Sequence, residues 1–118
     1  YNYLELRDEL GGDAAFRTTS DTETILAAYR RWGQDAPTHL RGMFAFALWD
    51  GRRRRLLLAR DRFGKKPLFY RLAPDGVAFG SELKAILEDP AVPRAPDPAA
   101  LAEYLGFGYV NAPRTAFA

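Results

Sequence analysis

The residues best suited to chemistry lie at the start of a helix and in a charged loop. Ser20-Asp21-Thr22-Glu23 opens a periodic segment, and a carboxylate in a first helical turn is stabilised by backbone N–H groups and the helix dipole. That position explains Asp21 without any ligand, so the local pattern leaves a structural and a binding role open. The charged loop between two expected strands contains Arg60, Asp61, Arg62, Lys65 and Lys66. A structural role that ties the strands together is favoured for this loop.

Several other chemistries are excluded or unsupported. The 118 residues contain no cysteine, which excludes disulfides, thiolate metal sites and a cysteine nucleophile within this sequence. His39 is the single histidine, and a lone histidine is more often a packing or surface residue than a catalyst or a zinc ligand. Glycine motifs that cradle phosphates or expose a nucleophilic serine are also missing. Residue patterns alone therefore support a domain and not a reaction.

The amino-acid composition limits which classes of binding partner are expected. The net charge of +2 comes largely from one run, Arg52–Arg55, which is expected at the exposed tip of a hairpin, so no nucleic-acid partner is predicted. No stretch of about 18 apolar residues and no charged-then-apolar leader is visible, so neither a membrane partner nor secretion is expected. A cytoplasmic protein with one main core is the expectation.

The strands that would position these residues are short and joined by turns. Met43–Trp49 is apolar at every position, which predicts a strand covered on both faces. Asp50-Gly51 provides the turn of a hairpin, and further strands are expected at 56–59, 68–72 and 77–79. Antiparallel neighbours connected in this way indicate an α+β domain with helices packed on sheets.

Helices are expected on either side of these strands. The spacing of Ile25, Tyr29 and Trp32 predicts a helix over 20–33 that begins with a Ser20–Glu23 capping box and ends at Gly33. Further helices are predicted over 2–10, over 37–41, from a Ser81 cap through Leu87, and from an Asp97 cap to Gly106. A short strand is expected at 16–19. The proline-rich residues 90–98 predict a linker or an extended arm.

Three motifs, which follow one another along the sequence, resemble segments of a known protein family. Ser20-Asp21-Thr22-Glu23, the segment 42–50 (GMFAFALWD) and the segment 60–70 (RDRFGKKPLFY) resemble the later part of the class II glutamine amidotransferase domain of glutamine-hydrolysing asparagine synthetases. The resemblance implies a partial amidotransferase domain over 1–89, a linker over 90–98 and the start of a synthetase domain over 99–118. The implied fold is a fragment of the four-layer αββα N-terminal-nucleophile hydrolase fold, with antiparallel sheets.

The resemblance also implies where the chemistry lies. In this family a cysteine at the mature N-terminus attacks the side-chain amide of glutamine, with its free α-amine as base. The family's Asn-Gly-Glu segment is expected just before Tyr1, so this chain holds no catalytic residue and is expected to be inactive alone. The aspartate of the Ser-Asp-Thr-Glu motif contacts the α-amino group of glutamine in the family, which makes Asp21 the one expected substrate-binding residue.

The function implied by the resemblance is glutamine hydrolysis to ammonia coupled to ATP-dependent amidation of aspartate. No cofactor is expected in this chain, while ATP and Mg are expected in the absent synthetase domain. Two alternatives stay open: another carboxylate acceptor, and a non-catalytic module of the same fold for dimerisation or regulation. The expected partners are glutamine, aspartate or another acceptor, and a second copy in a homodimer. The isolated chain is also expected to expose apolar sheet surface and to be poorly stable.

Overall fold

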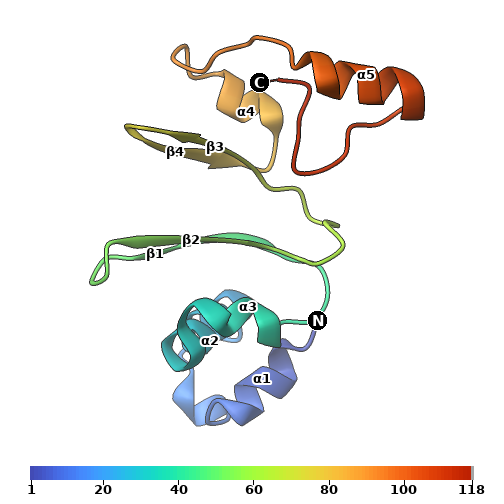
Figure 1. The fold of residues 1–118 in the computed structure, drawn as a ribbon. Helices are drawn as coiled ribbons and strands as arrows, with labels where there is room; N and C mark the ends of the chain where they lie inside the picture. Colours follow the sequence, from blue (N-terminus) through green and yellow to red (C-terminus); the bar gives the residue numbers. More distant parts are fainter. Residues whose placement is uncertain (118) are drawn as a thin grey trace. The chain divides into compact units, whose positions relative to one another are not determined.

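The computed structural model describes residues 1–117. The chain divides into two compact units, the first spanning Tyr1–Leu68 and the second beginning at Phe69. Each unit combines helices with one antiparallel two-stranded sheet (Figure 1). The predicted α+β class is therefore confirmed. Within residues 1–117, no helix has the length and apolar character needed to span a membrane.

The first unit contains three α-helices and one hairpin. Its helices are α1 (Tyr3–Glu9), α2 (Asp21–Trp32) and α3 (Ala36–His39), with short 3-10 turns η1 (Asp13–Ala15) and η2 (Gly33–Asp35). Its strands are β1 (Ala45–Asp50) and β2 (Arg55–Arg60), with Ala45 opposite Arg60 and Asp50 opposite Arg55. Gly33 ends α2 with a φ of 60°, a conformation that glycine adopts without steric cost.

The core of this unit lies between the hairpin and α2 with α3. Ala28 and Tyr29 from α2, Ala36 from α3 and Leu48 from β1 are buried together. Residues of the predicted helical stripe, among them Ile25 and Trp32, pack against this cluster. The His39 ring stacks on Trp32 with 3.9 Å between ring centroids, which agrees with a packing role for the histidine.

The hairpin turn is built around the side chain of Asp50. Its Oδ1 accepts the backbone N–H groups of Arg52 and Arg53, each at 3.0 Å, and its Oδ2 accepts from the Tyr29 hydroxyl at 3.0 Å. The bond from the Arg53 N–H is the main cause that lowers the pKa of Asp50 to about 2. The carboxylate therefore joins the turn to α2 as well as closing the turn itself.

Two predictions for this unit are wrong. β1 is covered on one face only, because Leu48 is buried whereas Trp49 is 62% exposed. Burial alternates along the strand, but its exposed face is apolar too, which agrees with the expectation that the isolated chain exposes apolar sheet surface. The segment 16–19 forms no strand, because the backbone N–H groups of Arg17 and Thr18 bond to the Glu23 side chain and not to a neighbouring strand.

The described part of the second unit, residues 69–117, has a hairpin and two helices. β3 (Phe69–Ala73) and β4 (Gly76–Gly80) are antiparallel, α4 spans Leu83–Leu87, and α5 spans Pro98–Phe107. Asp97 caps α5 as predicted, since its side chain accepts the Ala99 N–H at 2.9 Å. The segment before α5 is not detached, because Val92 is buried and the Asp97 N–H bonds to the Ala116 carbonyl at 3.0 Å.

The ends of both helices of this unit differ from prediction. Ser81 does not cap α4; Glu82 occupies the cap position, and its side chain makes no cap hydrogen bond. α5 continues past Gly106 to Phe107 and ends at Gly108, which has a left-handed φ of 78°. Gly108 ends the helix because it, and not Gly106, adopts the conformation that Cβ disfavours in other residues.

Replacing Tyr29 by phenylalanine tests the link between the hairpin turn and α2. Tyr29→Phe removes the donor to Asp50 and keeps the buried ring, so we expect the free energy of unfolding to fall by about 0.5–1.5 kcal/mol. Chemical denaturation of the two proteins measures this difference. An unchanged unfolding midpoint would show that the bond contributes nothing to stability.

Candidate functional site

Asp21, the residue expected to bind substrate, lies at the edge of a small pocket in the first unit. It is the first residue of α2, its side chain is exposed, and the pocket has a volume of about 60 Å³. The other lining residues come from the N-terminal segment, from α2 and from the segment before β1: Tyr1, Asn2, Tyr3, Thr24, Ile25, Leu40, Arg41, Met43 and Phe44. The structure therefore places Asp21 beside a concave surface and not on an open helix end.

One wall of the pocket is fixed by the buried side chain of Asn2. Its Nδ2 donates to the His39 carbonyl at 3.0 Å, and its Oδ1 accepts the Arg41 N–H at 2.8 Å. Gly42 has a φ of 102°, and a Cβ there would coincide with the Tyr1 ring. Only glycine therefore allows the backbone at residue 42 to approach the ring so closely.

Two polar side chains of the pocket lining, Asp21 and Thr24, have hydrogen-bonding capacity that the described residues leave largely unused. The Asp21 carboxylate has one weak neighbour among the described residues, the Thr22 hydroxyl at 3.5 Å, so most of its acceptor capacity faces the pocket or solvent. Thr24 is 1% exposed, and its hydroxyl has no hydrogen-bond partner within residues 1–117. An exposed carboxylate beside apolar and aromatic walls suits a small ligand that carries an ammonium group.

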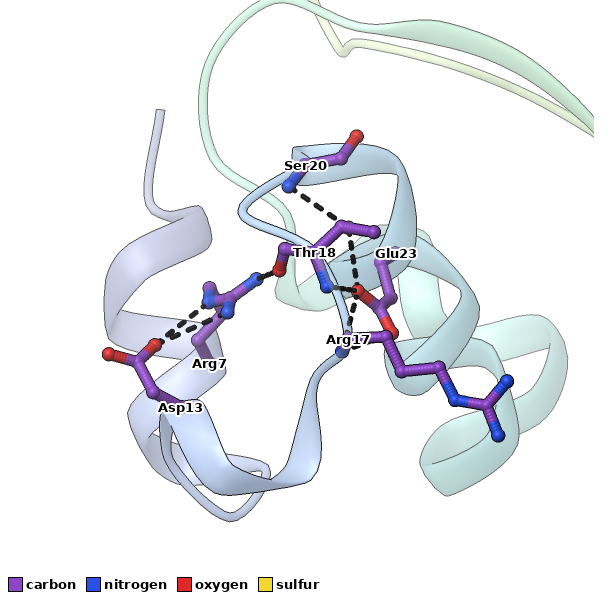
Figure 2. A network of polar contacts seen from close by, with 6 residues as sticks. All are labelled: Arg7, Asp13, Arg17, Thr18, Ser20 and Glu23. Carbon is purple, nitrogen blue, oxygen red and sulfur yellow. Dashed lines mark hydrogen bonds and ion pairs between the residues drawn. The ribbon is translucent and has the colours of Figure 1, made fainter.

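The segment that leads into Asp21 is held by the Glu23 side chain (Figure 2). Glu23 accepts the N–H groups of Arg17 at 2.9 Å and Thr18 at 2.7 Å, and the Thr18 hydroxyl at 2.7 Å. These bonds, led by the Arg17 N–H, lower the pKa of Glu23 to about 2. Ser20 caps α2 by accepting the Thr22 N–H, as predicted. The predicted capping box is nevertheless wrong in one of its two bonds: the Glu23 side chain accepts from the Arg17 and Thr18 N–H groups and not from the Ser20 N–H.

The same segment is held from the other side by Arg7 of α1. Arg7 is 4% exposed, and its Nη1 donates to the Thr18 carbonyl at 2.8 Å. Its Nη2 lies 3.2 Å from Oδ1 of Asp13, and its guanidinium carbon lies 4.2 Å above the Phe16 ring centre. The buried charge is thus paired by a carboxylate, a carbonyl and an aromatic face.

The charged loop after β2 has structural contacts. Asp61, which is buried, accepts the N–H groups of Lys65 and Lys66, each at 2.9 Å. The Lys66 bond is the main cause that lowers the pKa of Asp61. Arg60 donates to the Gly64 carbonyl at 2.9 Å, and Arg62 donates to carbonyls at the end of α3. These contacts agree with the favoured structural role of the loop and place none of its side chains in the pocket.

The sequence predicted Asp21 as a binding residue, which stays a prediction, and it gave no sign of the residues that support the surroundings of Asp21. Arg7 and Asn2 contact partners 6 to 39 positions away in the sequence, so no local spacing marks them. The proximity of Glu23 to Ser20 indicated a cap, but its longer reach to Arg17 and Thr18 was not visible. The unpartnered Thr24 hydroxyl also had no signal, because its position in α2 reads as an ordinary buried helical residue.

Comparison with known proteins identifies the family. Residues 1–118 match a family model described as "Glutamine amidotransferase domain". The chain therefore belongs to the glutamine amidotransferase domain family, which confirms the resemblance carried by the three motifs.

The most similar relatives include asparagine synthetases. The chain is 45% identical over 116 residues to asparagine synthetase [glutamine-hydrolyzing] 3 of Bacillus subtilis, covering 98% of this chain and 19% of that protein. It is 54% identical over 90 residues to a putative asparagine synthetase [glutamine-hydrolyzing] of Mycobacterium tuberculosis, covering 75% and 14%. It is also 40% identical over 87 residues to the amidase chyE of Penicillium rubens, covering 74% and 13%. The chain thus spans about a fifth or less of the length of these relatives.

The lowered pKa of Glu23 predicts a pH dependence of stability. The folded value of about 2 lies below the ordinary value of 4.5, so the contribution of Glu23 is complete above pH 4.5 and is lost as the pH falls toward 2. Glu23→Gln is expected to reduce the slope of unfolding free energy against pH in this window. Asp50 also has a folded pKa of about 2, so part of the slope remains.

Glu9→Gln is the matched control for this measurement. Glu9 is an exposed acid of α1 whose side chain makes no hydrogen bond or ion pair within residues 1–117. Its replacement makes the same change of charge and is expected to leave the slope unaltered. Equal slopes for the wild-type and Glu23→Gln proteins, measured by denaturation between pH 2 and 5, would contradict the role of Glu23.

Proposed function

We propose that this chain is part of the glutaminase domain of a glutamine-hydrolysing asparagine synthetase, and that Asp21 binds the α-ammonium group of glutamine. The observation that carries the assignment of Asp21 is its exposed carboxylate at the edge of the pocket, with a single weak polar neighbour. An ammonium group placed there would form a charge-assisted hydrogen bond with the carboxylate. The position of Asp21 in the Ser-Asp-Thr-Glu motif, which resembles that of the family, supports the same assignment.

In the proposed reaction, the residues of this chain bind and orient the substrate and do not react with it. A cysteine thiolate from elsewhere in the protein attacks the side-chain carbonyl carbon of glutamine, and the C–N bond breaks with release of ammonia. Water then hydrolyses the thioester to glutamate. Because this sequence has no cysteine, the chain alone is proposed to be inactive. Its contribution is to hold the α-amino end so that the amide meets the nucleophile.

The complete protein is proposed to use the ammonia for ATP-dependent amidation of aspartate in the cytoplasm. The names of the Bacillus and Mycobacterium relatives support this reaction. ATP and Mg are assigned to a synthetase domain that begins near residue 99. The four-layer αββα fold is part of the same proposal, and it is supported by large apolar side chains exposed on both hairpins, such as Trp49 and Leu72. Further layers of the complete protein would cover such surfaces.

A different acceptor is the second candidate. The similarity to a protein named amidase favours a glutaminase domain of the same kind that serves another carboxylate. A non-catalytic module for dimerisation or regulation is the third reading, and it requires no glutamine hydrolysis at all. Product analysis of the complete protein with glutamine, ATP, Mg and aspartate separates these readings: asparagine supports the first, glutamate without asparagine the second, and no glutamate the third.

Substitution of Asp21 tests the binding assignment in the complete protein. Asp21→Asn keeps an acceptor but removes the charge, and we expect KM for glutamine to rise about 10- to 100-fold, since a hydrogen bond between charged groups is worth about 1.5–3 kcal/mol. The deaminated analogue 4-carbamoylbutanoate lacks the ammonium group. Its KM is therefore expected to be the same for wild-type and Asp21→Asn proteins in an ammonia-release assay.

Asp8→Asn is the control, because Asp8 is an exposed acid of α1 outside the pocket. It makes the same change of charge and is expected to leave both KM values unchanged. An unaltered KM for glutamine in the Asp21→Asn protein would remove Asp21 from the site. Equal increases with both substrates would show that the substitution disturbs the pocket and does not remove an ammonium contact.

A further inference from the structure

We infer that Glu23 and Arg7 are positioning residues that hold the segment 17–20 from both sides and thereby fix the Asp21 carboxylate. The inference rests on the proposed function of Asp21 as the residue that binds the α-ammonium group. It concerns two side chains that lie outside the pocket lining. Figure 2 shows how they converge on Thr18 from different helices.

The Glu23 side chain organises a continuous set of hydrogen bonds that encloses Asp21. Its Oε2 accepts both the N–H and the hydroxyl of Thr18, each at 2.7 Å. The same Thr18 hydroxyl accepts the Ser20 N–H at 3.2 Å, and the Ser20 hydroxyl oxygen accepts the Thr22 N–H at 3.2 Å. Asp21 lies between Ser20 and Thr22 in the sequence, so the backbone on both sides of it belongs to this set.

Arg7 binds the carbonyl group of the same residue, Thr18. The Thr18 N–H points to the Glu23 carboxylate, and the Thr18 carbonyl accepts from Arg7 Nη1 at 2.8 Å. One exposed loop residue is therefore held by a negative and a positive side chain at once. Asp13 and the Phe16 ring keep the guanidinium in place. Charge-assisted bonds of this kind are the strong ones.

The segment has little else to keep it ordered. Residues 17–20 are exposed and lie in neither a helix nor a strand, and the N–H groups of Arg17, Thr18 and Ser20 all bond to side chains. Without these bonds the first turn of α2 would be free to shift. Displacement of a substrate-orienting group by about 1 Å is enough to cost up to 10²-fold in rate. Loss of Glu23 is therefore expected to act on glutamine binding through Asp21.

The test uses two substitutions in the complete protein, each measured with glutamine and with 4-carbamoylbutanoate. Glu23→Gln presents an amide to the N–H groups of the loop, and Thr18→Val removes the bridging hydroxyl at an exposed position. We expect KM for glutamine to rise about 10-fold in Glu23→Gln and by a smaller factor in Thr18→Val. KM for the analogue is expected to stay within about twofold, because the analogue does not use Asp21.

A double-mutant cycle shows whether Glu23 acts through Asp21. In the Asp21→Asn background, Glu23→Gln is expected to produce no further increase of KM for glutamine, because the group that it positions is already disabled. Full additivity of the two substitutions, or equal losses with both substrates, would overturn the inference. Glu9→Gln is the matched control and is expected to leave both KM values unchanged.

The outcomes also separate this inference from the proposed function. If Asp21→Asn raises KM for glutamine but Glu23→Gln and Thr18→Val do not, only the positioning role fails. If Asp21→Asn itself has no effect on KM, the proposed binding role fails and the positioning role fails with it. Activity with added ammonia in place of glutamine should be unaltered in every variant, and its loss in Glu23→Gln would indicate general damage and contradict the inference.

Discussion

A buried charge must be paired, and Arg7 is where this constraint shapes the first unit. A guanidinium that is 4% exposed would be strongly destabilising without partners. Its partners come from η1, from the ring of Phe16 and from the Thr18 carbonyl. Because these partners surround the Arg7 guanidinium, α1, η1 and the segment before α2 pack together. The pocket beside Asp21 is lined by the N-terminal segment, by α2 and by the segment before β1.

Local patterns predicted the elements well because local forces determine them. Ile25, Tyr29 and Trp32 face the core at helical spacing, and the hairpins follow from apolar runs joined by Asp and Gly turns. The proposed binding role of Asp21 came from the resemblance of a short motif to the family, whereas the local pattern alone left that role open. The motif did not reveal the pocket itself, because the pocket walls come from three separate parts of the sequence: residues 1–3, then 21, 24 and 25, and then 40, 41, 43 and 44.

The wrong predictions concern positions where a side chain has several possible hydrogen-bond partners nearby, or where the backbone conformation decides the end of a helix. Glu23 satisfied the loop instead of the Ser20 N–H, which at once broke the predicted capping box and prevented a strand at 16–19. Ser81 and Gly106 were reasonable helix ends by residue type, but the backbone conformations at Glu82 and Gly108 decided the ends. The apolar residues 43–49 led to the prediction that both faces of β1 are buried, but Trp49 is exposed in this chain in spite of its size.

The bonds from Glu23 to the loop are made mainly to the main chain, which every residue except proline offers alike. Within residues 1–117, the bonds to Glu23 use the main-chain N–H of Arg17 and not its side chain, and the side chain of Thr19 makes no hydrogen bond. The residues at positions 17 and 19 can therefore differ in charge and size without loss of these hydrogen bonds. The hydrogen bonds that fix the start of α2 are thus independent of the side chains that this loop exposes to solvent.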